Sequence, residues 1–370
     1  MNKYILIGCD IHEKTLVLRW SLRGRDVQEA TVANAPEDRA AMVQMFQTLC
    51  RKHRCAGIHF AYEASGLGFG LYDQLTDAGM KCYVLAPSAI PRSPKHASSK
   101  SDGRDAARLL EILSAHVVAG NRIPDIWVPD KQTRSDRDLL RLRQDLGHAV
   151  AAIKSRIKSL LRLHDIPIPE GHRLWGCKHM AWLKAISRKS SPRSPLLGSS
   201  RLTLASLLRR LESTQKEIRT LDGHIKELAE TPRYATLAKE LIRLNGVGLM
   251  TAMVFLTEIG DPRRFRNRKQ LAGFLGIVPR SHESGKMDDC KGHITRQGPG
   301  RVRGILCQAT WAAVRTDAYL KAVHRRIAKR NPRKRKIAIV AIMRRLALRM
   351  WHVMQEHWPE ETPAAEPAAS

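Results

Sequence analysis

The sequence predicts an α/β domain, then two long helices, then a mainly helical C-terminal domain. Short apolar runs alternate with helical patterns over residues 1–128, which is typical of an α/β domain. Over 129–232 apolar residues recur at helical spacing, and over 233–357 apolar helices alternate with glycine-containing turns. The segment 358–370 ("EETPAAEPAAS" at its core) has a low-complexity composition and is expected to be a disordered tail.

The first domain begins with three strand-like runs joined by short turns, which predicts an antiparallel meander. Helices and strands then alternate, and together with the meander this predicts an α/β domain over about residues 1–128. The expected strands are 3–9, 14–20, 27–33, 56–62 and 82–86, and the expected helices are 36–52, 69–79 and one that begins at Asp102.

The middle of the chain carries two amphipathic helical patterns, one from residue 131 to about 164 and one over 202–230. A linker near 187–200, rich in Ser, Pro and Arg, separates them and is expected to be a loop. Two long helices joined in this way predict an antiparallel hairpin or coiled-coil arm that joins protomers. A simple bundle packed on its own chain is the alternative.

The third domain contains the stretch "NGVG" at 245–248 between two apolar helices. Gly246 and Gly248 permit a tight turn whose amides approach a phosphate, as in helix-hairpin-helix modules. An ordinary helix–helix turn is the alternative. Two helices rich in Arg and Lys are expected at 302–329 and 334–357.

The charge of the chain indicates a polyanionic partner. The formal net charge is +29, and residues 261–350 alone hold 24 basic and five acidic side chains. Such an excess favours nucleic acid first and an anionic membrane surface second. No apolar run reaches the roughly 20 residues that cross a bilayer, so we expect no membrane partner.

The cysteines and the N-terminal residues indicate the compartment. Seven cysteines are scattered without C-x-x-C spacing, which is typical of reduced thiols and argues against a zinc site or a disulfide framework. The opening "MNKYILIGCDIHEK" meets charge too soon for a signal peptide. We therefore expect a cytoplasmic protein.

Four acids of the first domain form a candidate metal site. Asp10 follows the first apolar run, Glu63 follows the fourth, and Asp102 and Asp105 open the last helix three residues apart. In a ribonuclease-H-like topology the first and fourth strands are neighbours and a late helix lies beside them. The four carboxylates would then meet at one edge of the sheet.

Such crowding of negative charge predicts bound cations, with Mg²⁺ expected and Mn²⁺ as the alternative. Taken singly, the acids also fit a simpler interpretation, in which Asp10 and Glu63 are solvated and Asp102 and Asp105 cap a helix. Their joint appearance in a chain so poor in acids favours the metal site. His12 and Lys14 are expected to be solvated turn residues.

The stretches that carry these acids resemble a known family. "IGCDIHEKTLVL", "YEASG" and "VLAPSAIPRSPKHASSKSDGRDAARL" are similar to the RuvC-like N-terminal domain of a group of bacterial insertion-sequence transposases. That resemblance implies a D-E-D-D set of metal ligands at Asp10, Glu63, Asp102 and Asp105. The stretch from "LIRLNGVG" to "GPGRVRGIL" resembles the C-terminal domain of the same family, so the likeness extends over nearly the whole chain.

In that C-terminal domain a serine before a glycine serves as nucleophile, which implies Ser284, with Ser281 in reserve. A bare serine needs a base or strong electrostatic help to attack phosphorus. The surrounding loop is basic and glycine-rich, and its nucleic-acid-binding cations are expected to be Lys286, Lys291, Arg296, Arg301 and Arg303. Asp288 and Asp289 interrupt this basic stretch, and their role stays open.

The resemblance implies a bridge-RNA-guided DNA recombinase that excises and inserts a mobile element in the bacterial nucleoid. Its implied partners are donor and target DNA, a structured guide (bridge) RNA, and further copies of the chain in a dimer or tetramer with a composite site. Two rival hypotheses remain: a metal-dependent junction-resolving nuclease that uses water, and a non-catalytic nucleic-acid-binding protein.

Overall fold

The computed structural model describes residues 3–22, 25–90, 102–188, 195–280, 293–332 and 336–359. The chain forms two compact units, Met1–Pro129 and Asp130–Ser370. Each unit is described separately below. Among the described residues, the structure contains no helix that combines the length and the apolar character required to span a bilayer.

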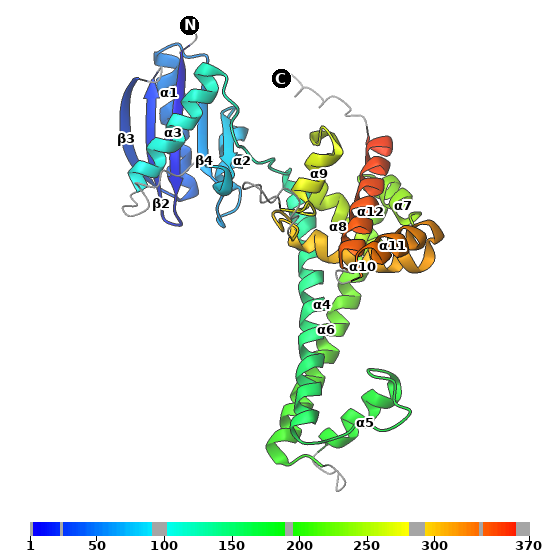
Figure 1. The fold of residues 1–370 in the computed structure, drawn as a ribbon. Helices are drawn as coiled ribbons and strands as arrows, with labels where there is room; N and C mark the ends of the chain where they lie inside the picture. Colours follow the sequence, from blue (N-terminus) through cyan, green and yellow to red (C-terminus); the bar gives the residue numbers. More distant parts are fainter. Residues whose placement is uncertain are drawn as a thin grey trace, which may run out of the picture. The chain divides into compact units, whose positions relative to one another are not determined.

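The first unit is built on a mixed five-stranded sheet with strand order β3-β2-β1-β4-β5 (Figure 1). β1 pairs antiparallel with β2, and β2 with β3, whereas β1 pairs parallel with β4, and β4 with β5. This arrangement confirms the predicted three-strand meander followed by alternating helices and strands. The strands are β1 (Tyr4–Ile11), β2 (Thr15–Leu22), β3 (Arg25–Ala33), β4 (Gly57–Glu63) and β5 (Lys81–Leu85).

Helices cover both faces of this sheet. Helices α1 (Pro36–Lys52) and α2 (Gly70–Asp77) pack on the face that carries Ile5, Ile7 and Cys9 of β1. Helix α3 (Asp102–Ala119) packs on the other face, against Leu6 of β1 and Ala61 of β4. Because side chains alternate along a strand, residues 6, 8 and 10 of β1 all belong to the α3 face.

Gly8 allows α3 to approach β1 very closely. A Cβ atom at this position would lie 2.3 Å from the carbonyl oxygen of Ala106 and 2.4 Å from the amide nitrogen of Leu110. Only a glycine therefore permits this contact between strand and helix. The contact fixes the first turns of α3 beside the end of β1, where Asp10 lies.

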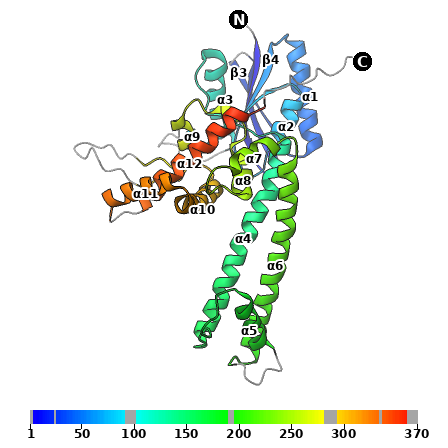
Figure 2. The same ribbon diagram turned by 90° about the vertical axis from the view of Figure 1, so that its right-hand side faces the viewer.

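The second unit begins with two long helices, α4 (Lys131–Leu163) and α6 (Gly198–Glu230), which lie side by side (Figures 1 and 2). A short helix that was not predicted, α5 (Cys177–Ser187), lies at the far end of this pair. Its Leu183 and Ile186 join a small apolar core formed by both long helices. The distal end of the pair therefore has a core of its own.

At the opposite end of the pair, shorter helices surround the almost fully buried α8. The apolar residues of this core come mainly from α7, α8, α9, α10 and α12, with the adjoining ends of α4 and α6. The helices are α7 (Ala235–Ile242), α8 (Leu249–Ile259), α9 (Arg268–Phe274), α10 (Gly300–Thr316), α11 (Ala318–Arg330) and α12 (Lys336–His357).

The single helix predicted at 302–329 is wrong, because the structure has two helices there, α10 and α11. Asp317 lies between them in an extended conformation, and its carboxylate accepts a hydrogen bond from the amide of Leu320. This is an N-cap, which ends one helix and starts the next. Apolar periodicity continues through the break, so the pattern alone did not reveal it.

The glycines of "NGVG" have different surroundings. Gly246 has φ +86°, and a Cβ atom there would lie 2.5 Å from the carbonyl oxygen of Ala309 on α10. Packing against α10 therefore accounts for this glycine. A Cβ atom on Gly248, the residue before α8, would meet open space. The helix-hairpin-helix interpretation stays a prediction. Gly248 is compatible with it, because the space beside this glycine at the start of α8 is open to a phosphate.

Candidate metal site and nucleophile loop

Two of the predicted ligands lie on neighbouring parallel strands. Asp10 is the next-to-last residue of β1 and Glu63 is the last residue of β4. The register pairs Cys9 with Tyr62, so Asp10 and Glu63 occupy the following position on each strand. Both belong to the face that α3 covers. Backbone register alone thus brings these two carboxylates to the same sheet edge.

The start of α3 supplies the other two acids. Asp102 and Asp105 both lie in its first turn, where the positive end of the helix dipole stabilises negative charge. The Asp102 side chain is half-exposed, whereas Asp10 is largely buried. Helix capping therefore remains compatible with Asp105. The position of Asp102 is explained better by its contact with His12.

His12 lies between two of the acids. Its Nε2 atom is 3.3 Å from Oδ2 of Asp10 and 3.2 Å from Oδ2 of Asp102. The expectation that His12 is a solvated turn residue is wrong, because its Nε2 atom is buried between the two carboxylates. The signal was present, because residues two apart at a strand end point to the same side, and His12 follows Asp10 by two.

Asp10, His12 and Asp102 form a group that suits a divalent cation. One potential ligand atom from each lies within 4.8 Å of the others, in the part of the chain that the structure describes. Glu63 and Asp105 are not in this group, although Glu63 ends the neighbouring strand β4 and Asp105 shares the first turn of α3 with Asp102. Carboxylate oxygens suit Mg²⁺ and Mn²⁺, and the imidazole nitrogen suits softer transition metals. The donor set therefore fits a divalent metal without selecting one.

The sheet beneath the site is apolar and holds a buried thiol. Burial raises the pKa of Cys9 well above its usual value, and the neighbouring charge of Asp10 and the thiol of Cys82 add to the effect. Cys9 is therefore a neutral core residue, not an anionic metal ligand. On the solvent side, Arg19 and Glu29 form an ion pair close to Gly103 at the start of α3.

The predicted nucleophile Ser284 lies outside the described residues, as do Ser281, Lys286, Lys291, Asp288 and Asp289. The described segments on each side of 281–292 pair with one another. The amide of Arg280 donates to the carbonyl of His293 at 2.9 Å, and the amide of Thr295 donates to the carbonyl of Val278 at 2.9 Å. The residues that precede and follow segment 281–292 therefore lie side by side, next to the helical core.

Two glycines allow the segments on either side of residues 281–292 to approach one another closely. Gly276 and Gly298 have φ values of +63° and +81°. A Cβ atom on Gly276 would lie 2.0 Å from the carbonyl oxygen of Gln297, and one on Gly298 would lie 1.9 Å from that of Phe274. These contacts exclude any side chain at either position.

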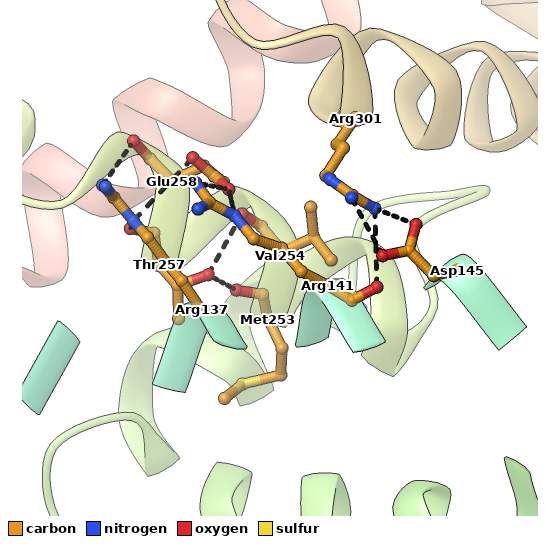
Figure 3. A network of polar contacts seen from close by, with 8 residues as sticks. All are labelled: Arg137, Arg141, Asp145, Met253, Val254, Thr257, Glu258 and Arg301. Atoms are coloured by element: carbon orange, nitrogen blue, oxygen red, sulfur yellow. Dashed lines mark hydrogen bonds and ion pairs between the residues drawn. The ribbon is translucent and has the colours of Figure 1, made fainter. Parts of the chain in front are cut away.

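The three described cations of the predicted loop are not equally available. Arg303 donates from Nη1 to the carbonyls of Leu275, Gln297 and Gly298, each at 3.1 Å, and so it stabilises the same glycine contacts. Arg301 forms two hydrogen bonds with Asp145 of α4, at 2.6 and 3.0 Å (Figure 3). Arg296 is exposed.

Arg301 and Asp145 adjoin a larger network that ties α4 to α8 (Figure 3). Arg137 donates to the carbonyls of Thr257 and Glu258 at 2.7 and 3.1 Å. Arg141 donates twice to the carboxylate of Glu258, which is buried. The network fixes the near end of α4 to the core helix α8.

Two family models match the chain. One, described as a transposase model with a DEDD domain, matches residues 7–165, and the other, described as "Transposase IS116/IS110/IS902 family", matches residues 238–325. The first contains all four predicted acids. The chain belongs to the IS116/IS110/IS902 family of transposases.

Curated relatives cover most of this transposase. A protein of Leptospira borgpetersenii named "Transposase for insertion sequence element IS1533" is 24% identical over 84% of this chain and 86% of its own. The protein y4qE of Sinorhizobium fredii, whose name includes the word transposase, is 28% identical over 81% of this chain and 76% of its own. The "Pilin gene-inverting protein" of Moraxella bovis is 31% identical over 38% of this chain and 44% of its own.

Proposed function

We propose that this transposase excises and inserts a mobile element through a serine nucleophile and a metal site made by Asp10, Glu63, Asp102 and Asp105. The observation that supports this most directly is the approach of Asp10, His12 and Asp102 to within 4.8 Å at the carboxyl end of β1. In a chain with an excess of 29 positive charges, such a group of acids has little reason to gather except to hold a cation.

In the proposed chemistry, the Ser284 hydroxyl attacks a DNA phosphodiester. A bond forms between Oγ and phosphorus, the bond to the leaving 3′ oxygen breaks, and the serine proton passes to solvent or to a carboxylate of the site. The product is a phosphoserine link, which a DNA hydroxyl reverses during rejoining. A bound Mg²⁺ or Mn²⁺ would supply electrostatic stabilisation of the attacking and leaving oxygens.

The positions of the acids suggest what each of them does. Asp10 and Glu63 are held by the sheet, so their carboxylates are positioned before substrate binds. Asp102 and Asp105 are carried by the first turn of α3, whose dipole favours their charged forms. Nε2 of His12 lies 3.3 Å from Asp10 and 3.2 Å from Asp102, so the imidazole can add a nitrogen ligand to the two carboxylates.

The partners are part of the same proposal. Donor and target DNA, a structured guide RNA, and a homo-oligomer of up to four copies working at the bacterial nucleoid follow from the family resemblance. The net charge of +29 supports binding of long polyanions. Sequencing of RNA that co-purifies with the protein tests the guide, since a discrete structured RNA is expected, and random cellular RNA would contradict it.

The experiment that tests the chemistry is strand transfer with Mg²⁺ by Ser284→Ala and, separately, by Asp102→Asn. Ser281→Ala is the matched control for the serine. Asp38→Asn is the control for the acid, because Asp38 also lies exposed in the first turn of a helix of the same unit. We expect loss of activity in the first two variants only.

A covalent adduct distinguishes the proposal from its rival. The parent protein should give a protein–DNA species on denaturing gels, and the Ser284→Ala variant should give none. Cleavage without rejoining by an active Ser284→Ala variant would show a metal-dependent nuclease instead. Tight DNA binding with no Mg²⁺-dependent chemistry in any variant would leave only a binding protein.

A further inference from the structure

Most of the excess positive charge of the long helix pair and the segment between its helices lies in the distal half. Residues 150–188 and 195–212 contain eleven Lys or Arg and three Asp or Glu, whereas residues 131–149 and 213–230 contain eight and seven. In the near half, basic residues are compensated, as in the pairs Arg143–Asp222 and Lys226–Glu230. In the distal half, Lys184–Glu212 is such a pair. The two halves therefore present very different surfaces.

Three cations form a row along the distal part of α4. Lys154, Lys158 and Arg162 are spaced four residues apart and adjoin the buried row Ile153, Ile157 and Leu161. Four residues of helix rise about 6 Å, so the row extends about 12 Å. In the described part of the chain, none of these three side chains forms an ion pair with a carboxylate. A polyanion would supply the missing counter-charge.

The segment before α5 completes this surface. The Lys154 ammonium lies 5.2 Å from the centre of the Trp175 ring, in a cation–π contact. Burial lowers the pKa of His179, and the charges of His172 and Lys158 lower it further, which places Lys158 beside the same cluster. Arg173 is exposed two residues before Trp175.

Trp175 is held in a conformation that bulky residues rarely adopt. Its φ is +64°, and its amide donates to Nδ1 of the buried His179 at 3.1 Å. The rings of Trp175 and His179 are also in edge-to-face contact, with centroids 5.3 Å apart. Backbone strain of this kind persists only where the surroundings enforce it, and it is common at ligand-binding positions. Trp175 is thus a positioning residue for Lys154.

We propose that Lys154, Lys158, Arg162, Arg173 and Trp175, called here the tip patch, bind the backbone of duplex DNA away from the reacting phosphate. This inference rests on the proposed function only in taking DNA as the substrate. Arg137 marks the point where α4 is bonded to α8. The distance along the α4 axis from Arg137 to Lys158 is about 32 Å. This is close to one turn of B-form DNA, so a duplex longer than one turn can reach the tip patch while its reacting phosphate lies elsewhere.

The test is equilibrium binding of the full-length protein to a 30-base-pair DNA duplex in EDTA, over a range of salt concentrations. The variant is Lys154→Gln, Lys158→Gln and Arg162→Gln together. The control removes the same charge from the near half, by Lys216→Gln, Arg219→Gln and Lys226→Gln. We expect the tip variant to bind at least about tenfold more weakly, with a salt slope lower by about 2–3.

Several outcomes would overturn the proposal: unchanged affinity and slope in the tip variant, an equal loss in the control, or loss of binding to an RNA duplex of the same length without loss on DNA. Trp175→Phe is the second variant, because it keeps a ring under Lys154 and should keep most of the affinity, whereas Trp175→Ala should not. No chemistry occurs in EDTA, so failure of the serine mechanism leaves this test unaffected.

Discussion

Arg141 on α4 donates two hydrogen bonds to the same carboxylate oxygen of Glu258 on α8, at 2.9 and 2.8 Å. Glu258 is buried, whereas Arg141 is partly exposed. A buried carboxylate is tolerable only with such partners, and removing it leaves arginine donors unpaired. The pair therefore fixes the near end of α4 to the core of the second unit.

Glu258→Gln should destabilise the second unit by about 1–3 kcal/mol, because Arg141 loses a charged acceptor while water reaches only part of its side chain. Chemical unfolding monitored by circular dichroism measures this. The control is Glu230→Gln, which removes an exposed helix pair with Lys226 and should cost less than about 0.5 kcal/mol. Equal losses in the two variants would mean that the buried contact is unimportant.

Gly8→Ala should disrupt the metal site from beneath. The added Cβ would lie 2.3 Å from the carbonyl oxygen of Ala106, so α3 must move away from β1. We expect a loss of about 1–3 kcal/mol or more and weaker metal binding. Gly57→Ala is the matched control on β4, because its Cβ would only touch the Tyr4 ring at 3.9 Å. Thermal melting measures the stability of both variants, and metal titration measures their metal affinity. Only Gly8→Ala should lose either.

His12→Ala should weaken Co²⁺ binding by about tenfold and Mg²⁺ binding much less, because an imidazole nitrogen is the softer ligand of the group. Calorimetric titration with each metal measures the two affinities. If both affinities fall equally, His12 is not the ligand that favours Co²⁺. Asp102→Asn should weaken both metals.

The stability of the first unit should fall below neutral pH because of His59. Burial lowers the pKa of this side chain to about 4, and the charges of Lys81 and His116 contribute. The folded state then binds fewer protons than the unfolded state between about 6.5 and 4. The stabilisation is complete above pH 6.5 and is lost as the pH falls through 4, by about 2–3 kcal/mol in total.

His59→Phe should remove this part of the pH dependence while keeping the ring contacts with Tyr4 and Tyr83. Melting temperatures of the parent and variant at pH 7.5 and pH 5 test this, and the difference between the two proteins excludes other titrating groups. A parent that shows the same pH dependence as the variant would contradict the assignment to His59.

Asp317→Ala should loosen the junction of α10 and α11. The hydrogen bond from the amide of Leu320 lowers the pKa of Asp317, and Arg349 contributes. Loss of an N-cap costs about 0.5–2 kcal/mol. Asp317→Asn keeps an acceptor and should recover most of the loss, as measured by urea unfolding.

Much of the first unit was predictable because strand alternation and helix-start signals are local. The boundaries of all five strands differ from the expected ones by only a few residues, and α3 begins at Asp102 as expected. The neighbouring positions of Asp10 and Glu63 depend on the pairing of β1 with β4, and the predicted topology made these two strands neighbours.

The remaining features depend on contacts that a sequence pattern does not contain. His12 became part of the site only through the position of Asp102, about 90 residues further along the chain. Helix α5 lies in a segment that begins after Gly176 and has little apolar periodicity, so tertiary packing of Leu183 and Ile186 determines it. The serine, the guide RNA and the oligomer remain predictions.

Helices α4 and α6 each contain 33 residues, and their near ends are fixed to the same core. A deletion in one of them alone would shift the side chains that meet at the far end out of register. Insertions and deletions in related proteins should therefore occur in matched pairs, one in each helix, and a shortened version of this protein will have to be engineered on the same principle.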